Sequence, residues 1–424
     1  MTEPAPITPA LLDLGNSTDP NALGWMQGTP PAADKRIRFA DGSWYQFPQF
    51  RWSFSHVREL VPTVNIPRGS QAVWALPRAQ RNDLDTLPFI PLLQTEAMTW
   101  AQSLVHNCTD GIVVLHRGQI VYERYAGALA EGGQHAAHSV TKSFVGTLGA
   151  SLVAEGLLDP DAPVTQYVPE LADSAFGTAT VRQVMDMTTG LQYGEDYTDP
   201  KAEIWTFLRA GNIFPRPADY AGPEGLQAFL QTVQPAGAHG QAFAYKTVNT
   251  DVLGWISQSV TGKPLAQSLS ERYWRRMGME QDAYLSIDGC GTAFAGGGLN
   301  TGLRDLARFG EMMRNDGRVD GPMGSEQIVP KAAVDDIRQG ADRGHFAKAG
   351  IPTLAGWSYR NMWWVSHNAH GAFSARGVHG QAIYIDPAAE MVIARYGSYP
   401  HAANVYIDPT SLPAYHALAQ HLMA

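Results

Sequence analysis

Short runs of apolar and β-branched residues stand near both ends of the chain, and polar turn residues separate them. Residues 111–125, GIVVLHRGQIVYERY, contain two such runs joined at Arg117-Gly118, a pattern that predicts a β-hairpin. Residues 381–387, QAIYIDP, and 391–398, MVIARYGS, predict a second hairpin near the C-terminus. We therefore expect the strands of the protein to come from both ends of the sequence.

Apolar residues at helical spacing are typical of the region between these hairpins. One helix is expected to start near Ser139 and to end with a C-cap at Gly156. Its apolar positions are Phe144, Val145, Leu148 and Leu152. Further helical patterns occupy residues 180–191, 225–233, 249–262 and 301–317, and little β signal occurs between about 170 and 275.

This order of elements predicts an α/β lobe that is interrupted by an all-α lobe, with a ligand cleft between the two. Residues 1–165 would hold an N-terminal wrap and the first part of the α/β lobe, 166–280 the mainly helical lobe, and 281–424 the second part of the α/β lobe. Residues 1–50, rich in Pro, Gly, Asp and Asn, are expected to wrap the surface or to reach towards a neighbour.

Charge and cysteine content exclude several classes of partner. The chain has 31 basic and 40 acidic residues without a basic block, so neither nucleic acid nor an anionic membrane is an expected partner. Cys108 and Cys290 have no metal-ligand spacing, which fits a reducing compartment or indifference to redox conditions, and no metal is expected. No run approaches the roughly 20 apolar residues of a membrane span, and no signal peptide is recognisable. The sequence thus predicts a soluble, cytoplasmic protein.

The stretch 138–149, HSVTKSFVGTLG, places a lysine one helical turn after a serine. A serine hydroxyl needs a base within hydrogen-bond reach, and an uncharged Lys142 on the same helix face as Ser139 would supply one. Burial or a nearby cation would lower the lysine pKa from about 10.4. The Ser139 N–H at the helix start offers half of an oxyanion hole. The alternative is a capping serine with a solvated lysine, and this motif alone is weak evidence.

Two later segments add polar groups. In residues 243–251, FAYKTVNTD, Tyr245 is a candidate second base, because a cationic lysine nearby would favour its phenolate. A buried tyrosine that donates one hydrogen bond is the alternative. Residues 374–386, SARGVHGQAIYID, predict a glycine-bearing edge strand whose N–H completes the oxyanion hole, or else an ordinary terminal strand. Gly296-Gly297-Gly298 is expected to permit tight packing under the site.

In this order and spacing, these segments resemble the penicillin-recognising serine hydrolases, in particular the class C β-lactamase-like branch. The stretches LQYGEDYTDP, FAYKTVNTD, NMWW and GVHGQAIYIDP further resemble the 6-aminohexanoate-dimer (nylon-oligomer) hydrolase group over nearly the whole chain. The resemblance implies a β-lactamase-like fold of the α/β plus all-α class, an antiparallel sheet flanked by helices with an inserted helical lobe. It implies no cofactor, and a homodimer is implied by the resemblance alone.

The resemblance also implies roles for single residues. Ser139 would be the nucleophile, Lys142 its proton acceptor, and Tyr245 would deliver the proton to the leaving group. The N–H groups of Ser139 and Val378 would hold the oxyanion. Substrate-binding positions would be Tyr197 at the scissile amide nitrogen, Trp364 as an aromatic wall, Asn249, Gly377 and His379. For His379, a structural role at the strand end competes with a role in the site.

Two departures from the family pattern concern the substrate. The Lys-Thr-Gly triplet of β-lactamases is Ala375-Arg376-Gly377 here, which disfavours recognition of a penicillin carboxylate. The acid that holds the ammonium of the nylon-oligomer substrate corresponds to Leu208, and the nearest acids are Glu195, Asp196 and Glu203. The ammonium of the aminohexanoate dimer therefore lacks its expected acidic partner. A neutral ester or amide would suit the sequence equally well as a substrate.

The sequence thus predicts a serine hydrolase that cleaves small linear amides or short-chain carboxylic esters through an acyl-enzyme. A β-lactamase or D,D-peptidase is the first alternative, and the lack of a secretion signal argues against it. A binding protein that kept the fold without catalysis is the second alternative. The intact set of Ser139, Lys142 and Tyr245 argues against that reading.

Overall fold

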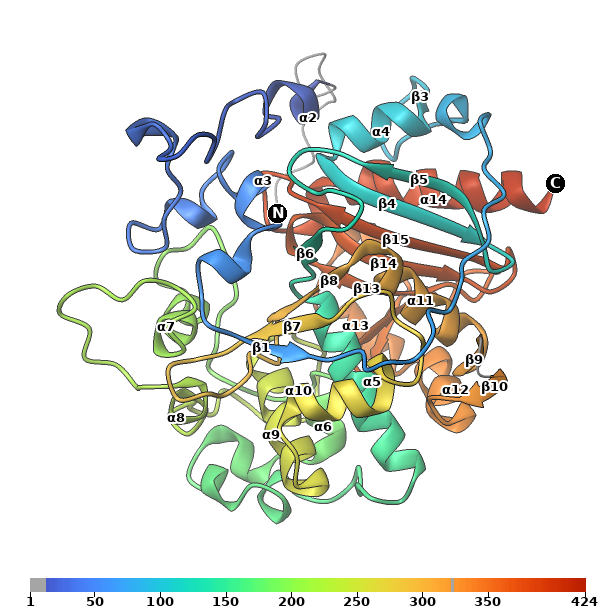
Figure 1. Ribbon diagram of the computed structural model, residues 1–424. Helices are drawn as coiled ribbons and strands as arrows, with labels where there is room; N and C mark the ends of the chain where they lie inside the picture. The colour runs from blue at the N-terminus through green and yellow to red at the C-terminus, as the bar shows by residue number, and fades with distance from the viewer. Residues whose placement is uncertain (1–12, 322–323) are drawn as a thin grey trace.

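The central sheet of the protein takes its strands from both ends of the chain. The computed structural model describes residues 13–321 and 324–424. Seven strands follow the order β11-β12-β13-β14-β15-β4-β5, and every neighbouring pair is antiparallel (Figure 1). Their bounds are β4 Thr109–His116, β5 Gln119–Tyr125, β11 Ser358–Arg360, β12 Trp363–Val365, β13 Phe373–Gly377, β14 Gln381–Asp386 and β15 Met391–Gly397. Both predicted hairpins, β4–β5 and β14–β15, are confirmed.

A second, smaller sheet connects distant parts of the sequence. Its order is β1-β7-β8-β6, also antiparallel, with β1 Thr63–Ile66, β6 Gln134–Ala136, β7 Ala283–Ser286 and β8 Leu299–Gly302. Two short pairs are β2 Pro88–Phe89 with β3 Met98–Thr99, and β9 Arg318–Gly321 with β10 Gly324–Gln327. Because β1 pairs with β7, the N-terminal part of the chain is built into the fold beside residues that follow the helical lobe.

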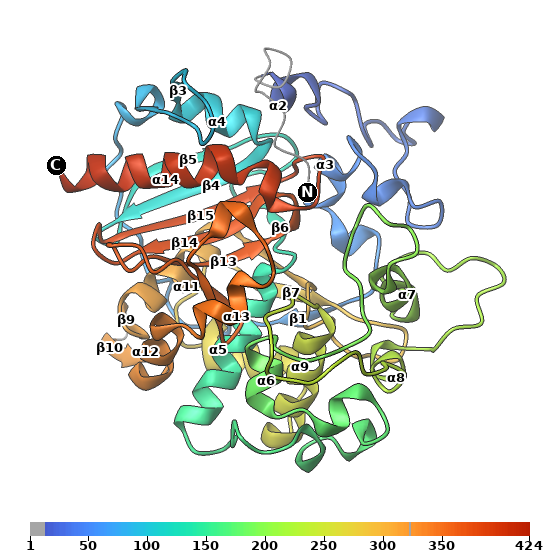
Figure 2. The ribbon, with the colours of Figure 1, turned by 180° about the vertical axis from the view of Figure 1, so that it is seen from behind.

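Helices cover both faces of the large sheet, and alternate residues of its central strands belong to different cores. In β4, Ile112 and Val114 pack with α4 (Trp100–His106) and α14 (Asp408–Met423). The intervening Val113 and Leu115 join the main core with α5 (Val140–Ala154) and α11 (Leu303–Arg314). Figures 1 and 2 show these two layers of helices on opposite sides of the sheet. The predicted fold class, an antiparallel sheet flanked by helices, is confirmed.

Residues 166–280 contain helices and no strand of either sheet. The helices here are α6 Val181–Met185, α7 Glu203–Ala210, α8 Leu226–Leu230, α9 Val248–Thr261 and α10 Leu265–Leu269. The remaining helices are α2 Leu14–Ser17, α3 Phe50–Ser53, α12 Lys331–Gln339 and α13 Arg343–Ala347. One continuous core runs from the sheet into these helices, so the two lobes share their packing. Within the described ranges, no helix has the length and apolar character that crossing a bilayer requires.

The N-terminal segment packs onto its own chain. Phe50 and Phe54 form a buried cluster with Tyr284 of β7. The buried Arg51 guanidinium forms an ion pair with Asp110 of β4, 3.3 Å away. Within the predicted wrap, Ile37 and Trp44 are also buried, in a cluster with Trp52, whereas residues 13–36 apart from Pro20 are exposed or partly exposed. Residues 1–12, which fall under the same prediction, lie outside the described residues.

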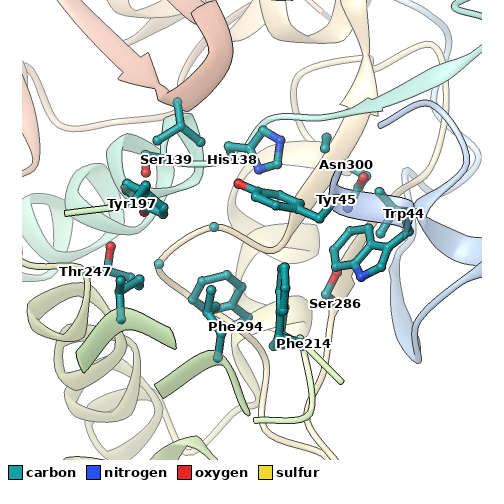
Figure 3. Close-up of a pocket in the computed structure, with 18 residues that line it drawn as sticks. Trp44, Tyr45, His138, Ser139, Tyr197, Phe214, Thr247, Ser286, Phe294 and Asn300 are labelled. Carbon is teal, nitrogen blue, oxygen red and sulfur yellow. The ribbon is translucent and has the colours of Figure 1, made fainter. Parts of the chain in front are cut away.

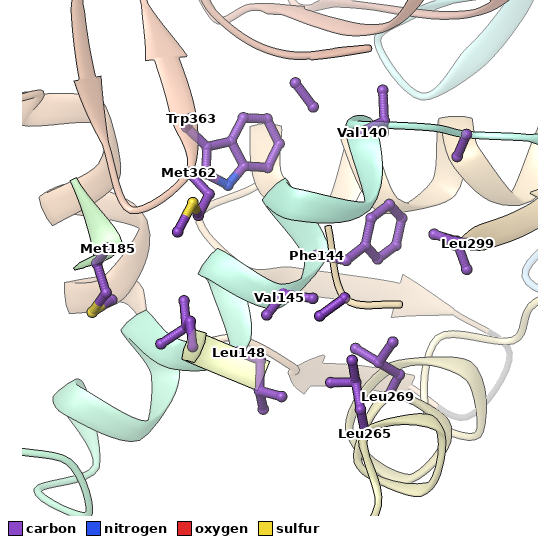
Figure 4. Packing of buried hydrophobic residues seen from close by; sticks show 14 of the residues in the cluster. Val140, Phe144, Val145, Leu148, Met185, Leu265, Leu269, Leu299, Met362 and Trp363 are labelled. Atoms are coloured by element: carbon purple, nitrogen blue, oxygen red, sulfur yellow. The ribbon is translucent and has the colours of Figure 1, made fainter. Parts of the chain in front are cut away.

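Helix α5, which carries the serine and the lysine, is enclosed on every side. Each of its residues from Val140 to Leu152 is buried, so the helix has no solvent face over this length. Its apolar side chains pack against α6, α10 and β8 (Figure 4). Its polar side chains are satisfied internally: Ser143 donates to the Met362 carbonyl at 2.8 Å, and Thr147 accepts from the Trp363 indole at 3.0 Å. The C-cap is Glu155, one residue before the predicted Gly156, which follows with φ +72°.

Gly146 is the point of closest contact between α5 and the turn before β12. A Cβ atom there would lie 2.1 Å from the Asn361 carbonyl oxygen, which belongs to the backbone and cannot rotate away. We expect Gly146→Ala to lower the free energy of unfolding by about 3 kcal/mol or more, because the added methyl forces α5 off the turn. Urea denaturation followed by circular dichroism measures this.

Gly149→Ala is the matched control on the same helix. Its added Cβ would meet the methyl ends of Leu253 at 3.2 and 3.3 Å and of Met185 at 3.3 Å, all on flexible side chains, and alanine is the better helix former. Equal midpoints for the two variants would contradict the packing argument.

Candidate active site

Ser139 and Lys142 lie together at the N-terminal end of α5, as the spacing predicts. Ser139 is the N-cap residue, and the Lys142 side chain returns one turn along the helix to place its Nζ 3.0 Å from the Ser139 Oγ. The two side chains belong to residues that are 7% and 1% exposed. The Ser139 side chain therefore caps no backbone group. It contacts the Lys142 amine in a site that is almost closed to solvent.

Lys142 is held between two acidic groups and a carbonyl. Its Nζ donates to the Gly296 carbonyl at 2.6 Å. Burial lowers the pKa of Lys142 to about 8, although the charges of Glu195 and Asp251 act in the opposite direction. Burial lowers the lysine pKa, as expected. The sequence also allowed for a nearby cation, but the charged neighbours that act on the amine are the anions Glu195 and Asp251. An amine of this kind releases its proton close to neutral pH.

Asp251 lies behind the lysine, on α9. Its Oδ1 accepts from the Gly296 N–H at 3.3 Å, and its Oδ2 has no hydrogen-bond partner although it is buried. Burial raises the pKa of Asp251 above its usual value. Gly296 must be glycine here, since a Cβ would lie 2.4 Å from the Thr247 methyl carbon. The glycine triplet thus allows close packing beneath the site, as predicted.

Tyr245 faces Ser139 from the other side. Burial, and then the Glu195 charge, hold the pKa of Tyr245 well above 10, although Ser139 acts in the opposite direction. The Lys142 Nζ lies 5.1 Å from the centre of the Tyr245 ring. The expectation that a cationic lysine favours the phenolate is therefore wrong for the free protein, because desolvation of a buried phenolate dominates. Tyr245 keeps its proton and is a donor.

The end of β13 passes beside the start of α5. A Cβ on Gly377 would lie 3.0 Å from the Ala137 carbonyl oxygen and 3.1 Å from the Ser139 nitrogen. This close approach brings the backbone of Gly377 and Val378 to the Ser139 N–H, where both residues line the cavity around Oγ. β13 itself is an interior strand between β12 and β14, so the edge-strand prediction is wrong. Only its last residues lack a partner on the β12 side, because β12 pairs no further than Ser374.

Two chambers meet at Ser139. The wider one has a volume of about 340 Å³, and its walls include Tyr245, Trp364 and Arg376. The narrower one has a volume of about 70 Å³ and lies on the side of the N-terminal segment. Ser139, Tyr197 and Val378 line both chambers. The hydroxyl oxygen of Ser139 thus stands at a junction from which a substrate could extend in two directions.

Aromatic and aliphatic side chains make up most of the narrow chamber. Figure 3 shows the rings of Tyr45, Phe214 and Phe294 facing one another across it, with Ser139 and Tyr197 at one end. Leu208, which corresponds to the ammonium-binding acid in the resemblance, lines this chamber and is 7% exposed. The lining contains no Asp, Glu, Lys or Arg side chain.

The acids near the GEDY segment have other partners. The Glu195 carboxylate accepts hydrogen bonds from the Tyr197 hydroxyl at 2.9 Å and from the Thr247 hydroxyl and N–H, both at 2.6 Å. Glu203 accepts from the Gly194 N–H at 2.7 Å, and Asp196 is engaged by Thr198 in an exposed turn. Of these acids, Glu195 alone lines a chamber, the wide one. It positions Tyr197 and the start of α9 at the same time.

Two of the predicted binding residues lie behind the site. Asn249 is fully buried and lines neither chamber. Its side chain accepts a hydrogen bond from the Thr189 hydroxyl at 2.7 Å and donates one to the Lys246 carbonyl at 3.1 Å. His379 is 3% exposed, and its Nδ1 lies 2.7 Å from the Tyr399 carbonyl oxygen. Its Nε2 is then free to accept from the Tyr45 hydroxyl at 3.3 Å. The histidine therefore positions a wall residue of the narrow chamber.

Trp364, the predicted aromatic wall, lines the wide chamber. Its ring stacks on Tyr245 with centroids 5.6 Å apart, and the Arg376 guanidinium lies over the Trp364 ring, 5.4 Å from its centroid. Arg376 forms an ion pair with the buried Asp408 of α14. The positive charge at the Lys-Thr-Gly position is thus already balanced within the protein.

Sequence reasoning missed the residues that close the narrow chamber and tune the lysine. Trp44 and Tyr45 precede Ser139 by more than ninety positions, so no local spacing connects them with the motif. Asp251 ends the FAYKTVNTD segment, four positions after Thr247, and helical periodicity could have placed both on one face of α9. In the part of the chain that the structure describes, no group of three or more His, Cys, Asp or Glu side chains is arranged to hold a metal ion.

Comparisons with known proteins agree with this geometry. A family model described as beta-lactamase matches residues 103–409. The chain is 36% identical to a 6-aminohexanoate-dimer hydrolase of Paenarthrobacter ureafaciens over 84% of its own length and 88% of the relative's. It is 29% identical to esterase EstB of Burkholderia gladioli over 42% of this chain and 47% of that protein. A solved Bacillus anthracis structure, provisionally assigned as a 6-aminohexanoate-dimer hydrolase, superposes with a TM-score of 0.83 at 33% identity, covering 93% of this chain and 98% of that one.

Proposed function

The chain belongs to the beta-lactamase family and is a serine hydrolase of amides or esters, and on that premise we propose that Ser139, Lys142 and Tyr245 carry out the reaction. One observation carries the proposal. The Ser139 Oγ lies 3.0 Å from an amine whose pKa burial has lowered, at the junction of two chambers. A hydroxyl so placed has both a proton acceptor and access to a carbonyl carbon.

Acylation begins when the Ser139 hydroxyl gives its proton to the Lys142 amine and its oxygen bonds to the substrate carbonyl carbon. The carbonyl electrons move onto oxygen, and the N–H groups of Ser139 and Val378 stabilise the oxyanion. Tyr245 then donates its phenolic proton to the leaving nitrogen or oxygen as the bond to the carbonyl carbon breaks. The tyrosine recovers a proton from Lys142, which returns the amine to its neutral form.

Deacylation repeats these steps with water. The Lys142–Tyr245 pair accepts a proton from the water as its oxygen attacks the ester carbon of the acyl-enzyme. The oxyanion again lies against the two backbone N–H groups. The Ser139 oxygen leaves with a proton returned from the pair, and the carboxylic acid is released.

Activity is expected to rise with pH through the pKa of Lys142, because only the neutral amine accepts the serine proton. The kcat/KM for p-nitrophenyl butyrate should increase to a plateau with a midpoint near pH 8. The negative charge of Asp251 raises the pKa of Lys142, so Asp251→Asn should move this midpoint down by about 1 unit. An upward shift, or a profile without a rise below pH 9, would refute this assignment of the base.

A small linear amide or ester is the substrate class that we propose. Both chambers have aromatic walls, and the narrow one offers no charged partner for a terminal ammonium, since Leu208 stands where the resemblance places an acid. The relative from Paenarthrobacter ureafaciens is a 6-aminohexanoate-dimer hydrolase, and esterase EstB acts by its name on esters. We therefore propose that short-chain carboxylic esters and neutral amides are cleaved in preference to the aminohexanoate dimer.

A penicillin-type substrate is the alternative. Arg376 could meet its carboxylate, but the guanidinium is already paired with the buried Asp408. Rates on p-nitrophenyl acetate, p-nitrophenyl butyrate, aminohexanoate dimer and nitrocefin decide between the classes. We expect the esters to be fastest. Nitrocefin hydrolysis at a rate comparable to the ester rate would overturn the assignment. A cytoplasmic location and a homodimer stay predictions, which fractionation and size-exclusion chromatography test.

A further inference from the structure

The narrow chamber contains polar atoms that nothing in the protein satisfies. The Asn300 Oδ1, the His138 Nε2 and the Trp44 Nε1 are each buried without a hydrogen-bond partner among the described residues, and all three residues line this chamber. Asn300 is 1% exposed and Trp44 is 5% exposed. A buried polar atom without a partner costs free energy, so several around one cavity indicate a polar ligand group.

The roles of two of these atoms are fixed by chemistry. The Asn300 amide nitrogen donates to the Gly298 carbonyl at 2.9 Å, and a carbonyl oxygen only accepts, so Oδ1 is left as an acceptor. The Trp44 indole N–H only donates. Burial lowers the pKa of His138 well below its usual value, so its imidazole is neutral. Three residues of the chamber lining therefore carry an unpaired acceptor, an unpaired donor and an uncharged imidazole, and the lining contains no carboxylate.

The acyl part of the substrate occupies this chamber if the mechanism above holds. Tyr245, the proposed donor to the leaving group, lines the wide chamber and not the narrow one. The leaving group must lie on the side of that donor, so the acyl chain points the other way. Figure 3 shows Trp44 and Asn300 at the end of the narrow chamber away from Tyr197 and Thr247, where the tip of such a chain would arrive.

We propose that the narrow chamber binds a linear acyl chain that ends in a neutral group able both to donate and to accept a hydrogen bond, a hydroxyl or a carboxamide. Asn300 accepts from that group, and Trp44 donates to it. This inference rests on the proposed function. An ammonium has donors only and finds no anion here, while a methyl end leaves all the polar atoms unpaired. A site built to pair a hydroxyl discriminates strongly against an analogue without one.

Matched p-nitrophenyl esters test the inference without any variant. The acyl chains have five to eight carbons and end in a methyl, hydroxyl, carboxamide or ammonium group, and uncatalysed hydrolysis is subtracted. At the best chain length, we expect kcat/KM for the hydroxyl or carboxamide ester to exceed that of the methyl ester about tenfold. The kcat/KM for the hydroxyl or carboxamide ester should exceed the kcat/KM for the ammonium ester about a hundredfold. Equal rates for hydroxyl and methyl ends, or a preference for ammonium, would overturn the inference.

A variant assigns the preference to the chamber. Asn300→Leu keeps the side-chain size but removes the acceptor, and it should reduce the ratio of hydroxyl to methyl kcat/KM about tenfold. Asn65→Leu, at an exposed position of β1, is the control and should leave the ratio unchanged. Ester cleavage that shows no dependence on the chain end would refute the inference but leave the proposed function standing. A folded protein that cleaves none of the esters would refute the proposed function itself.

Discussion

Replacing Ser139 by alanine is expected to abolish turnover of p-nitrophenyl butyrate, with kcat/KM falling by a factor of about 10⁴ or more. Without Oγ there is no atom to form the acyl-enzyme, and the remaining N–H groups stabilise only a direct attack by water. The 3.0 Å contact with Lys142 Nζ is lost at the same time, but the lysine keeps its second acceptor, the Gly296 carbonyl. The variant should therefore fold normally, which its urea denaturation midpoint would show.

Ser143→Ala is the matched control for this loss. Ser143 lies one turn further along α5, is also buried, and donates to the Met362 carbonyl away from both chambers. This variant should keep its ester hydrolysis at a temperature well below its unfolding midpoint. A fluorophosphonate probe should label the parent protein and Ser143→Ala but not Ser139→Ala. Labelling of Ser139→Ala, or retained turnover by it, would remove Ser139 from the mechanism.

Substitution of Lys142 is expected to have the second-largest effect, a loss of about 10³- to 10⁴-fold in kcat/KM. Lys142→Met removes the base while preserving most of the buried volume. Lys142→Arg keeps a positive charge beside Ser139, but a guanidinium does not accept a proton in this pH range. Both variants should therefore fail equally if the lysine is a proton acceptor. If its role were only to supply charge, Lys142→Arg would retain much of the activity.

The pH dependence separates the base from a merely structural lysine. The residual activity of Lys142→Met should lack the rise with a midpoint near pH 8 that the amine gives the parent protein. Tyr245 does not replace it, because burial and the Glu195 charge keep its pKa well above 10. An unchanged rise in Lys142→Met would assign the titration to another group.

The strands and the serine–lysine pair were predictable because each depends on local spacing. Side chains three positions apart on a helix share a face, which is why Ser139 and Lys142 meet once α5 forms. In the turn at Arg117-Gly118, Gly118 has φ +75°, which glycine adopts readily, and β4 and β5 pair across it. The place of β13 inside the sheet was not predictable, since a strand's partners are chosen by the whole topology.

The sequence by itself determined which nucleophile and base come together, through the period of one helix. Only the tertiary structure decided what these groups can do. The pKa of Lys142 depends on burial and on Glu195 and Asp251, which come from elements distant in the chain. The chamber beside Ser139 likewise depends on Trp44 and Asn300, which meet there because β1 pairs with β7 and the N-terminal segment packs over the site. Desolvation and cavity shape are properties of the packed molecule, and no short segment of the sequence encodes them.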